Sequence, residues 1–190
     1  MTLNFKKSLG QNFLIDNKII NLTTEIGNIE HKDSILEVGP GDGSLTKRLL
    51  EENPKNLTVI EKDKRLVDIL GEKFDGKITI VNEDMMNFDY GNFRHKNLII
   101  FGNLPYNIST QILAKWIKME NLNKFCKKFV LMFQKEVADR IIAKFNSSCY
   151  GRLSILSNWK LSIEKICDIK PESFSPKPKI DSSLLFFSPK

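Results

Sequence analysis

The chain has 190 residues, of which 41% are hydrophobic and 27% are charged. This balance excludes a disordered, collagen-like or coiled-coil protein and fits one globular domain with its own core. The apolar runs at 98–101 and 129–133 are far shorter than the roughly 20 residues that cross a bilayer, so no membrane partner is expected. Residues 1–7 carry no signal-peptide pattern, and a cytoplasmic location is expected.

Lys and Arg number 29 against 23 Asp and Glu, which gives a net charge of +6. Local basic spots at Lys6 and Lys7, at 124–128, and at Lys177 with Lys179 could contact an acidic polymer such as RNA. Solvated lysine faces are the alternative, and charge alone leaves both open. The three cysteines and two histidines are isolated, which fits neither a disulfide framework nor a zinc site, so we predict no metal.

Short apolar runs alternate with helix-period segments along the chain, a pattern typical of βαβ units around a mainly parallel sheet. We predict helices at 18–26, after residue 44, and at 108–117 and 137–145, with strands at 35–38, 57–61, 78–82, 98–103 and 129–133. Further strand-like segments follow at 153–156, 161–165 and 183–187. The predicted fold is therefore α/β, a mainly parallel sheet with helices on both faces and an antiparallel C-terminal hairpin. Residues 1–190 are predicted to form a single domain, because no composition break marks a linker.

A glycine-rich loop at 37–43 follows the first predicted parallel strand and leads into a helical pattern. Gly39 and Gly41 allow a tight turn and the close approach of a ligand to the backbone. The third glycine, Gly43, comes one position too early for a dinucleotide fingerprint, and no Gly-Lys-Ser/Thr is present. The spacing therefore disfavours NAD and excludes a P-loop.

Two carboxylates follow the next two predicted strands. Glu61 is positioned to accept hydrogen bonds from the hydroxyls of a ribose, and Asp84 to accept from the exocyclic amine of an adenine. Either residue taken alone is equally well explained as an ordinary loop acid. The two carboxylates follow, in chain order, a glycine loop that lacks the features of a phosphate-binding loop. Together, the loop and the carboxylates predict a nucleoside that carries an amino-acid tail, S-adenosylmethionine.

The segment Asn103-Leu104-Pro105-Tyr106 ends the fourth predicted strand, at the edge where open α/β sheets bind ligands. The Asn103 side chain and the Leu104 carbonyl could accept both N–H groups of a planar exocyclic amine and favour a pyramidal nitrogen. Pro105 would fix the turn without adding a donor, and Tyr106 offers a face for the base to stack on. Positioning could then carry methyl transfer without a histidine or cysteine, although a plain β-turn explains the same four residues.

A second candidate wall lies at 174–179. Phe174 could stack on the other face of a flipped base, and Lys177 and Lys179 could contact phosphate. A proline-rich connector into the last strand is the alternative, and the sequence leaves that choice open.

In chain order these motifs resemble those of the adenine-N6 RNA methyltransferase family, most closely its small-subunit ribosomal RNA adenine dimethyltransferase branch. The matching segments are 11–14, 37–43, 103–109, 134–138, 150–154 and 174–182, with Glu61 and Asp84 between them. The resemblance implies a Rossmann-like methyltransferase that uses S-adenosylmethionine to dimethylate N6 of two adjacent adenosines near the 3′ end of small-subunit rRNA. It implies a role in ribosome biogenesis, with small-subunit rRNA or the immature small subunit as partner, and a monomer is expected.

The resemblance also implies residue roles. Cofactor contacts are implied for Asn12, Leu14, Gly39, Glu61, Asp84 and Asn103. Asn103 would serve both the cofactor and the target, with Tyr106 and Phe174 sandwiching the target adenine. Family members usually continue into a small helical C-terminal domain that helps to grip the ribosomal particle, and this sequence ends before it. Cofactor binding should not need that domain, because every matching motif lies within the chain.

Three rival functions stay open at this point. One is a methylase of the same family that acts on a single adenosine of large-subunit rRNA and confers antibiotic resistance. A second is a non-catalytic ribosome-assembly or transcription factor that retains the fold. The weakest is a dehydrogenase, which micromolar binding of NAD would revive.

Overall fold

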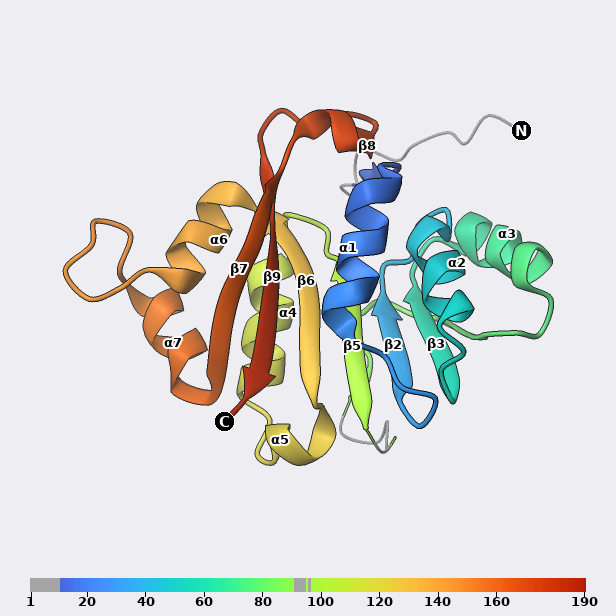
Figure 1. Cartoon of the computed structure of the whole chain (residues 1–190), viewed down its shortest axis with the longest axis horizontal. Helices are drawn as coiled ribbons and strands as arrows, with labels where there is room; N and C mark the ends of the chain where they lie inside the picture. Colours follow the sequence, from blue (N-terminus) through green and yellow to red (C-terminus); the bar gives the residue numbers. More distant parts are fainter. Residues whose placement is uncertain (1–10, 91–94, 96) are drawn as a thin grey trace.

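A mixed sheet of seven strands organises the chain, in the order β4-β3-β2-β5-β6-β9-β7 (Figure 1). The computed structural model describes residues 11–90, 95 and 97–190. The strands of this sheet are β2 (Ser34–Val38), β3 (Asn56–Glu61), β4 (Thr79–Asn82), β5 (Leu98–Asn103), β6 (Lys128–Gln134), β7 (Leu161–Ile169) and β9 (Ser182–Pro189). The order reverses between β2 and β5, because β3 and β4 extend to one side and β5 and β6 to the other.

Strands β2 to β6 are parallel, as the sequence pattern predicts. All five residues of β2 are buried, and Val38 aligns with Ile60 on one neighbour and Gly102 on the other. A strand covered on both faces has no solvent side to alternate toward, which explains why the apolar residues Ile35 and Leu36 occupy consecutive positions. The five predicted parallel strands are confirmed, with ends that differ by one residue at most.

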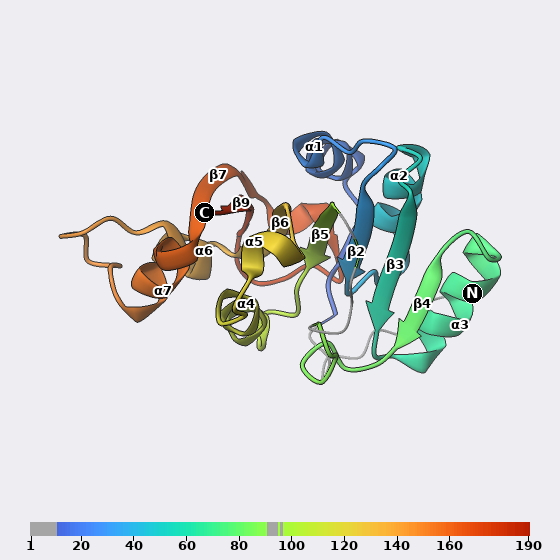
Figure 2. The same ribbon diagram turned by 90° about the horizontal axis from the view of Figure 1, so that it is seen from below.

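Helices cover both faces of the sheet (Figure 2). They are α1 (Asn17–Gly27), α2 (Ser44–Glu51), α3 (Lys64–Phe74), α4 (Ser109–Ile117), α5 (Leu122–Phe125), α6 (Lys135–Ile142) and α7 (Arg152–Lys160). Helices α1 and α2 bury Ile20 and Leu49 against one face, whereas α4 buries Ile112 and Leu113 against the other. Burying apolar stripes of this kind is the main stabilising contribution to such a layered fold.

The C-terminal part adds the predicted antiparallel hairpin. Strand β9 inserts between β6 and β7 and is antiparallel to both. The excursion from β7 to β9 contains the short helix η2 (Pro171–Ser173) and strand β8 (Phe174–Ser175). Strand β8 pairs with β1 (Phe13–Leu14), so a segment near the start of the chain is held against one near its end.

Three parts of the predicted secondary structure are wrong or incomplete. Residues 153–156, predicted as a strand, belong to α7. This helix carries apolar side chains on its inner and its outer face, so the 3.6-residue period is weak. Helix α3 was not predicted, although Leu66, Leu70 and Phe74 follow a helical spacing. Helix α6 ends at Ile142 rather than at residue 145.

The described helices include none that is long and apolar enough to cross a membrane. Within the same residues, no three His, Cys, Asp or Glu side chains group as metal ligands would. The three cysteines are unpaired, with Cys126 buried, Cys167 half-buried and Cys149 exposed.

Candidate functional site

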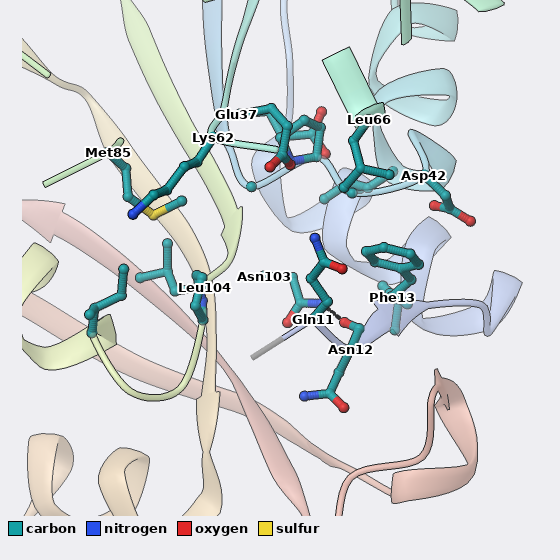
Figure 3. Close-up of a pocket in the computed structure, with 18 of the residues that line it drawn as sticks. Gln11, Asn12, Phe13, Glu37, Asp42, Lys62, Leu66, Met85, Asn103 and Leu104 are labelled. Atoms are coloured by element: carbon teal, nitrogen blue, oxygen red, sulfur yellow. Dashed lines mark hydrogen bonds between the residues drawn. The ribbon is translucent and has the colours of Figure 1, made fainter. Parts of the chain in front are cut away.

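An open cavity lies beside the carboxyl ends of β2, β3 and β5, where the strand order reverses (Figure 3). Ligands of open parallel sheets bind at such a switch point. The cavity measures about 1120 Å³, a volume that includes the open solvent at its mouth. The predicted site residues in its lining are Asn12, Leu14, Gly39, Gly41, Glu61, Asp84, Asn103, Leu104, Pro105 and Tyr106.

The glycine loop forms the wall between β2 and α2. Gly39 and Gly41 have φ angles of 73° and 59°, in the left-handed region where a side chain is strained. A Cβ atom on Gly41 would also come within 2.6 Å of the Phe13 ring, which packs over the loop. Glycine at this position therefore lets the N-terminal arm close against the loop and shape the cavity.

Glu61 ends β3 and is 7% exposed. Its Oε1 accepts a hydrogen bond from the backbone N–H of Asp63 at 2.9 Å. Burial raises the pKa of Glu61 above its ordinary value, and hydrogen bonds from the backbone of Asp63 and Gly41 oppose that shift. A buried carboxylate at a cavity wall is a strong acceptor for a pair of hydroxyl groups.

Asp84 follows β4 and carries two hydrogen-bond partners. Its Oδ2 pairs with Lys62 Nζ at 2.7 Å, and its Oδ1 accepts from the backbone N–H of Met86 at 2.9 Å. The hydrogen bond from Lys62 is the main reason that the pKa of Asp84 is lowered. The ionised carboxylate keeps lone pairs for a further donor, since two oxygens offer about four acceptor positions.

The Asn103 side chain points into the centre of the site (Figure 3). Its Nδ2 donates to the backbone carbonyl of Asn12 at 2.6 Å. This bond directs the N–H side of the amide toward the N-terminal arm and leaves the amide oxygen as the acceptor. The following turn is closed by Ile108 N–H, which donates to the Pro105 carbonyl at 3.1 Å.

Tyr106 borders the cavity, and its hydroxyl group is held by a hydrogen bond to another strand. Its hydroxyl lies 2.6 Å from Ser182 Oγ at the start of β9. Burial raises the pKa of Tyr106 above its ordinary value, so the phenol is neutral at physiological pH. A ring anchored through its hydroxyl offers a fixed surface to a planar ligand.

Phe174 does not line the cavity. The β1–β8 pairing aligns it with Leu14, and its ring is 3% exposed in the apolar cluster that contains Ile20. Of the two rings predicted to stack on the target base, Tyr106 borders the cavity and Phe174 does not, and the stacking of either ring on a base stays a prediction. Packing an apolar ring into an adjacent core removes its surface from water, which explains this placement.

Two of the predicted RNA-contacting lysines, Lys177 and Lys179, lie outside the cavity lining. Lys177 is exposed and pairs with Glu172, and Lys179 is exposed on the same segment between β8 and β9. Lys6 and Lys7 lie outside the residues that the structure describes. Contact of these four lysines with RNA stays a prediction.

Several lining residues were not assigned a role from the sequence. Glu37 is buried at the end of β2, where it accepts from Thr46 Oγ1 at 2.6 Å. Burial raises the pKa of Glu37 to about 8. The arm residue Gln11 donates to Asp63 Oδ2 at 3.2 Å. Glu37 could have been predicted as a site residue, because it directly precedes the Val-Gly of the glycine loop. No local feature of the sequence marks Gln11.

Comparison with known proteins agrees with this geometry. A family model described as ribosomal RNA adenine dimethylase matches residues 2–190. A protein of Pelagibacter ubique named ribosomal RNA small subunit methyltransferase A is 56% identical over 190 residues, which are 100% of this chain and 72% of that protein.

Two solved structures are also similar. A dimethyladenosine transferase from Plasmodium falciparum has a TM-score of 0.84 and 30% identity, over 94% of this chain and 63% of that one. A 23S rRNA methyltransferase has a TM-score of 0.79 and 27% identity, over 94% and 70%. From the matches over nearly its whole length, the chain belongs to the ribosomal RNA adenine dimethylase family.

Proposed function

We propose that this chain transfers methyl groups from S-adenosylmethionine to N6 of two adjacent adenosines near the 3′ end of small-subunit rRNA. Dimethylation of rRNA adenines, as a step in ribosome biogenesis, is the activity of the family to which the chain belongs. The observation that carries the proposal is the oriented Asn103 amide at the end of β5, beside the Tyr106 ring and in the same cavity as Glu61.

The residues of the cavity fit S-adenosylmethionine. Glu61 would accept from the ribose hydroxyls, and Asp84 would accept from the adenine amine while keeping its pair with Lys62. Gly39 and Gly41 would admit the methionine part close to the backbone, since neither position has a side chain to collide with it. Asn12 and Leu14 would cover the cofactor from the N-terminal arm.

The target amine would be held by acceptors at the end of β5. Asn103 Oδ1 and the Leu104 carbonyl would each accept one N–H, which favours a nitrogen lone pair directed out of the plane of the base. Tyr106 would stack on one face of that base. When bound, S-adenosylmethionine supplies an activated sulfonium methyl group. The described lining contains no histidine or cysteine, so the protein's contribution is orientation and electrostatics.

Small-subunit rRNA is the favoured substrate. The Pelagibacter relative, 56% identical, is named for the small subunit, whereas the similar 23S rRNA enzyme is 27% identical. We propose further that the whole chain works as one methyltransferase domain, because the cofactor and target residues surround a single cavity. The chain spans 72% of the length of that relative.

Transfer of radiolabelled methyl from S-adenosylmethionine tests the proposal. Unmethylated small subunits, large subunits and naked rRNA are supplied in parallel, and the labelled nucleoside is identified after digestion. Dimethyladenosine in small subunits alone supports the proposed substrate. Label in large-subunit rRNA would instead favour the antibiotic-resistance activity. Measurable cofactor binding without any label would favour a non-catalytic assembly role.

A further inference from the structure

Large apolar side chains are exposed mainly at one place on the molecule. Four of the six such side chains in the described residues fall between positions 145 and 159. They are Phe145 at 77% exposure, Tyr150 at 37%, Ile155 at 56% and Trp159 at 63%. Scattered apolar residues need no explanation, but several exposed large apolar side chains within one segment of 15 residues indicate an interaction site.

The fold does not need these side chains for its core. Helix α7 turns Leu153 and Leu156 toward the sheet, where they pack against the main apolar cluster. Ile155 and Trp159 are four positions apart, so they share the outward face of the helix. The Phe145 and Tyr150 rings meet edge to face, 5.7 Å apart, in the loop that precedes α7.

Three cations of the same part of the chain lack acidic partners among the described residues. Arg140, Lys144 and Arg152 are exposed and form no ion pair with any described residue. Lys160 Nζ lies 4.7 Å from the centre of the Trp159 ring. In contrast, Lys135 at the start of α6 is paired with Asp139. We name the four apolar residues and the three unpaired cations the α7 patch.

We propose that the α7 patch binds an unpaired segment of rRNA, as a second contact surface outside the cofactor cavity. Bases would stack on the exposed rings, and phosphates would contact Arg140, Lys144 and Arg152. Stacking platforms interleaved with cations are the usual means of binding single-stranded RNA. The choice of RNA as the partner rests on the proposed function. The exposed rings and unpaired cations of the patch support, by themselves, only the binding of a negatively charged polymer that carries planar groups.

The position of the patch suits contact with a large particle. The loop between α6 and α7 projects from the β7 side of the sheet, on the opposite side of the molecule from α3 (Figure 1). The second view shows the same projection (Figure 2). No residue of the patch is in the cavity lining. Loss of the patch should therefore weaken RNA binding and leave cofactor binding unchanged.

Intrinsic fluorescence gives a direct measurement, because the two tryptophans differ in environment. Trp159 is exposed and Trp116 is fully buried, so a stacking ligand quenches the first and spares the second. The probe is a short unstructured RNA oligonucleotide added to the full chain. Inorganic polyphosphate supplies charge without bases, and phosphatidylglycerol vesicles supply an anionic lipid surface. Quenching by RNA alone supports the proposal, whereas equal quenching by polyphosphate or vesicles would overturn it.

Paired substitutions separate stacking from apolar docking. Trp159→Leu keeps an apolar side chain without a ring and should weaken RNA binding about tenfold, whereas Trp159→Phe should retain most of the affinity. Arg152→Ala should lower the slope of log affinity against log salt by about 0.7, and the exposed Lys55→Ala on the far side serves as the charge-matched control. The proposal would be overturned if Trp159→Leu bound the RNA oligonucleotide as tightly as the unmodified chain does. It would also be overturned if the unmodified chain self-associated and Trp159→Leu did not.

Titration with S-adenosylmethionine and a thermal melt accompany each variant. Unchanged cofactor affinity and Tm show that the fold is intact, so a loss of RNA binding then reports on the patch. If the chain failed to methylate any subunit but bound RNA through Trp159, the proposed function would fail while this inference held.

Discussion

The Asn103 side chain donates a hydrogen bond of 2.6 Å to the backbone carbonyl of Asn12, which lies 91 positions earlier in the sequence. This bond joins the carboxyl end of β5 to the N-terminal arm. The pairing of Leu14 with Phe174 holds the same arm from its other side. The arm and the end of β5 therefore form one wall of the cavity, and the orientation of the Asn103 amide depends on both.

Glu61→Ala should weaken binding of S-adenosylmethionine by about 10- to 100-fold, because hydrogen bonds to a charged group contribute roughly 1.5–3 kcal/mol. Isothermal titration measures this loss. Glu72→Ala, at an exposed position on α3, is the matched control and should bind like the unmodified chain. Unchanged affinity of Glu61→Ala would remove Glu61 from the cofactor site.

Tyr106→Ala should slow methyl transfer while leaving cofactor affinity nearly unchanged, because the ring is assigned to the target base. Tyr106→Phe keeps the ring and loses the bond to Ser182, so it should keep most of the turnover. Single-turnover transfer to unmethylated small subunits measures both variants. A Tyr106→Ala chain that lost cofactor binding and kept turnover would show that the division of roles is wrong.

Lys115→Met should weaken cofactor binding several-fold through the segment that contains Asp84. Lys115 Nζ donates to the carbonyls of Met86 and Phe88, at 2.9 Å and 2.8 Å, and so holds that segment against α4. Lys118→Met, one turn along the same surface, is the control because Lys118 is exposed. Equal affinities of the two variants would mean that Lys115 has no positioning role.

Stability should fall as the pH rises from about 5 to 8. Burial raises the pKa of Glu37 to about 8, and burial also raises that of Glu61. A carboxyl whose pKa is higher in the folded state favours folding fully below its unfolded pKa, and this contribution is lost as the pH rises through its folded pKa.

Glu37→Gln removes the buried acid and keeps an acceptor for Thr46. Thermal melts should then show a smaller decline between pH 5 and 8 than the unmodified chain shows. At pH 8 the gain should be on the order of 3 kcal/mol, or roughly 5–10 °C in Tm. A decline of equal size in both chains would contradict the assignment of Glu37.

The parallel strands and the carboxylates at their ends could be predicted because their signals are local. Glu61 and Asp84 each follow an apolar run, and parallel strands bring their carboxyl ends to one edge. The bond between Asn103 and Asn12 could not be predicted, since it depends on how distant segments pack. Helix α7 was mistaken for a strand because its outward face carries Ile155 and Trp159, which hide the helical period.

The burial of Phe174 shows the same limit at the level of one side chain. From the sequence, Phe174 could be a stacking ring or part of a proline-rich connector into the last strand. Pairing of β8 with β1 aligns Phe174 with Leu14 and places the ring in the apolar cluster. Which neighbour a short strand chooses is a tertiary property, so local pattern cannot determine it.

We propose that the Asn103 amide holds the target amine for methylation. The most direct test incubates unmethylated small subunits with S-adenosylmethionine and either the unmodified chain or Asn103→Ala, and measures dimethyladenosine by mass spectrometry after digestion. We predict dimethyladenosine with the unmodified chain and a rate at least about 100-fold lower with Asn103→Ala, at saturating cofactor and an unchanged melting profile. Equal rates of dimethyladenosine formation by the two chains would contradict the claim.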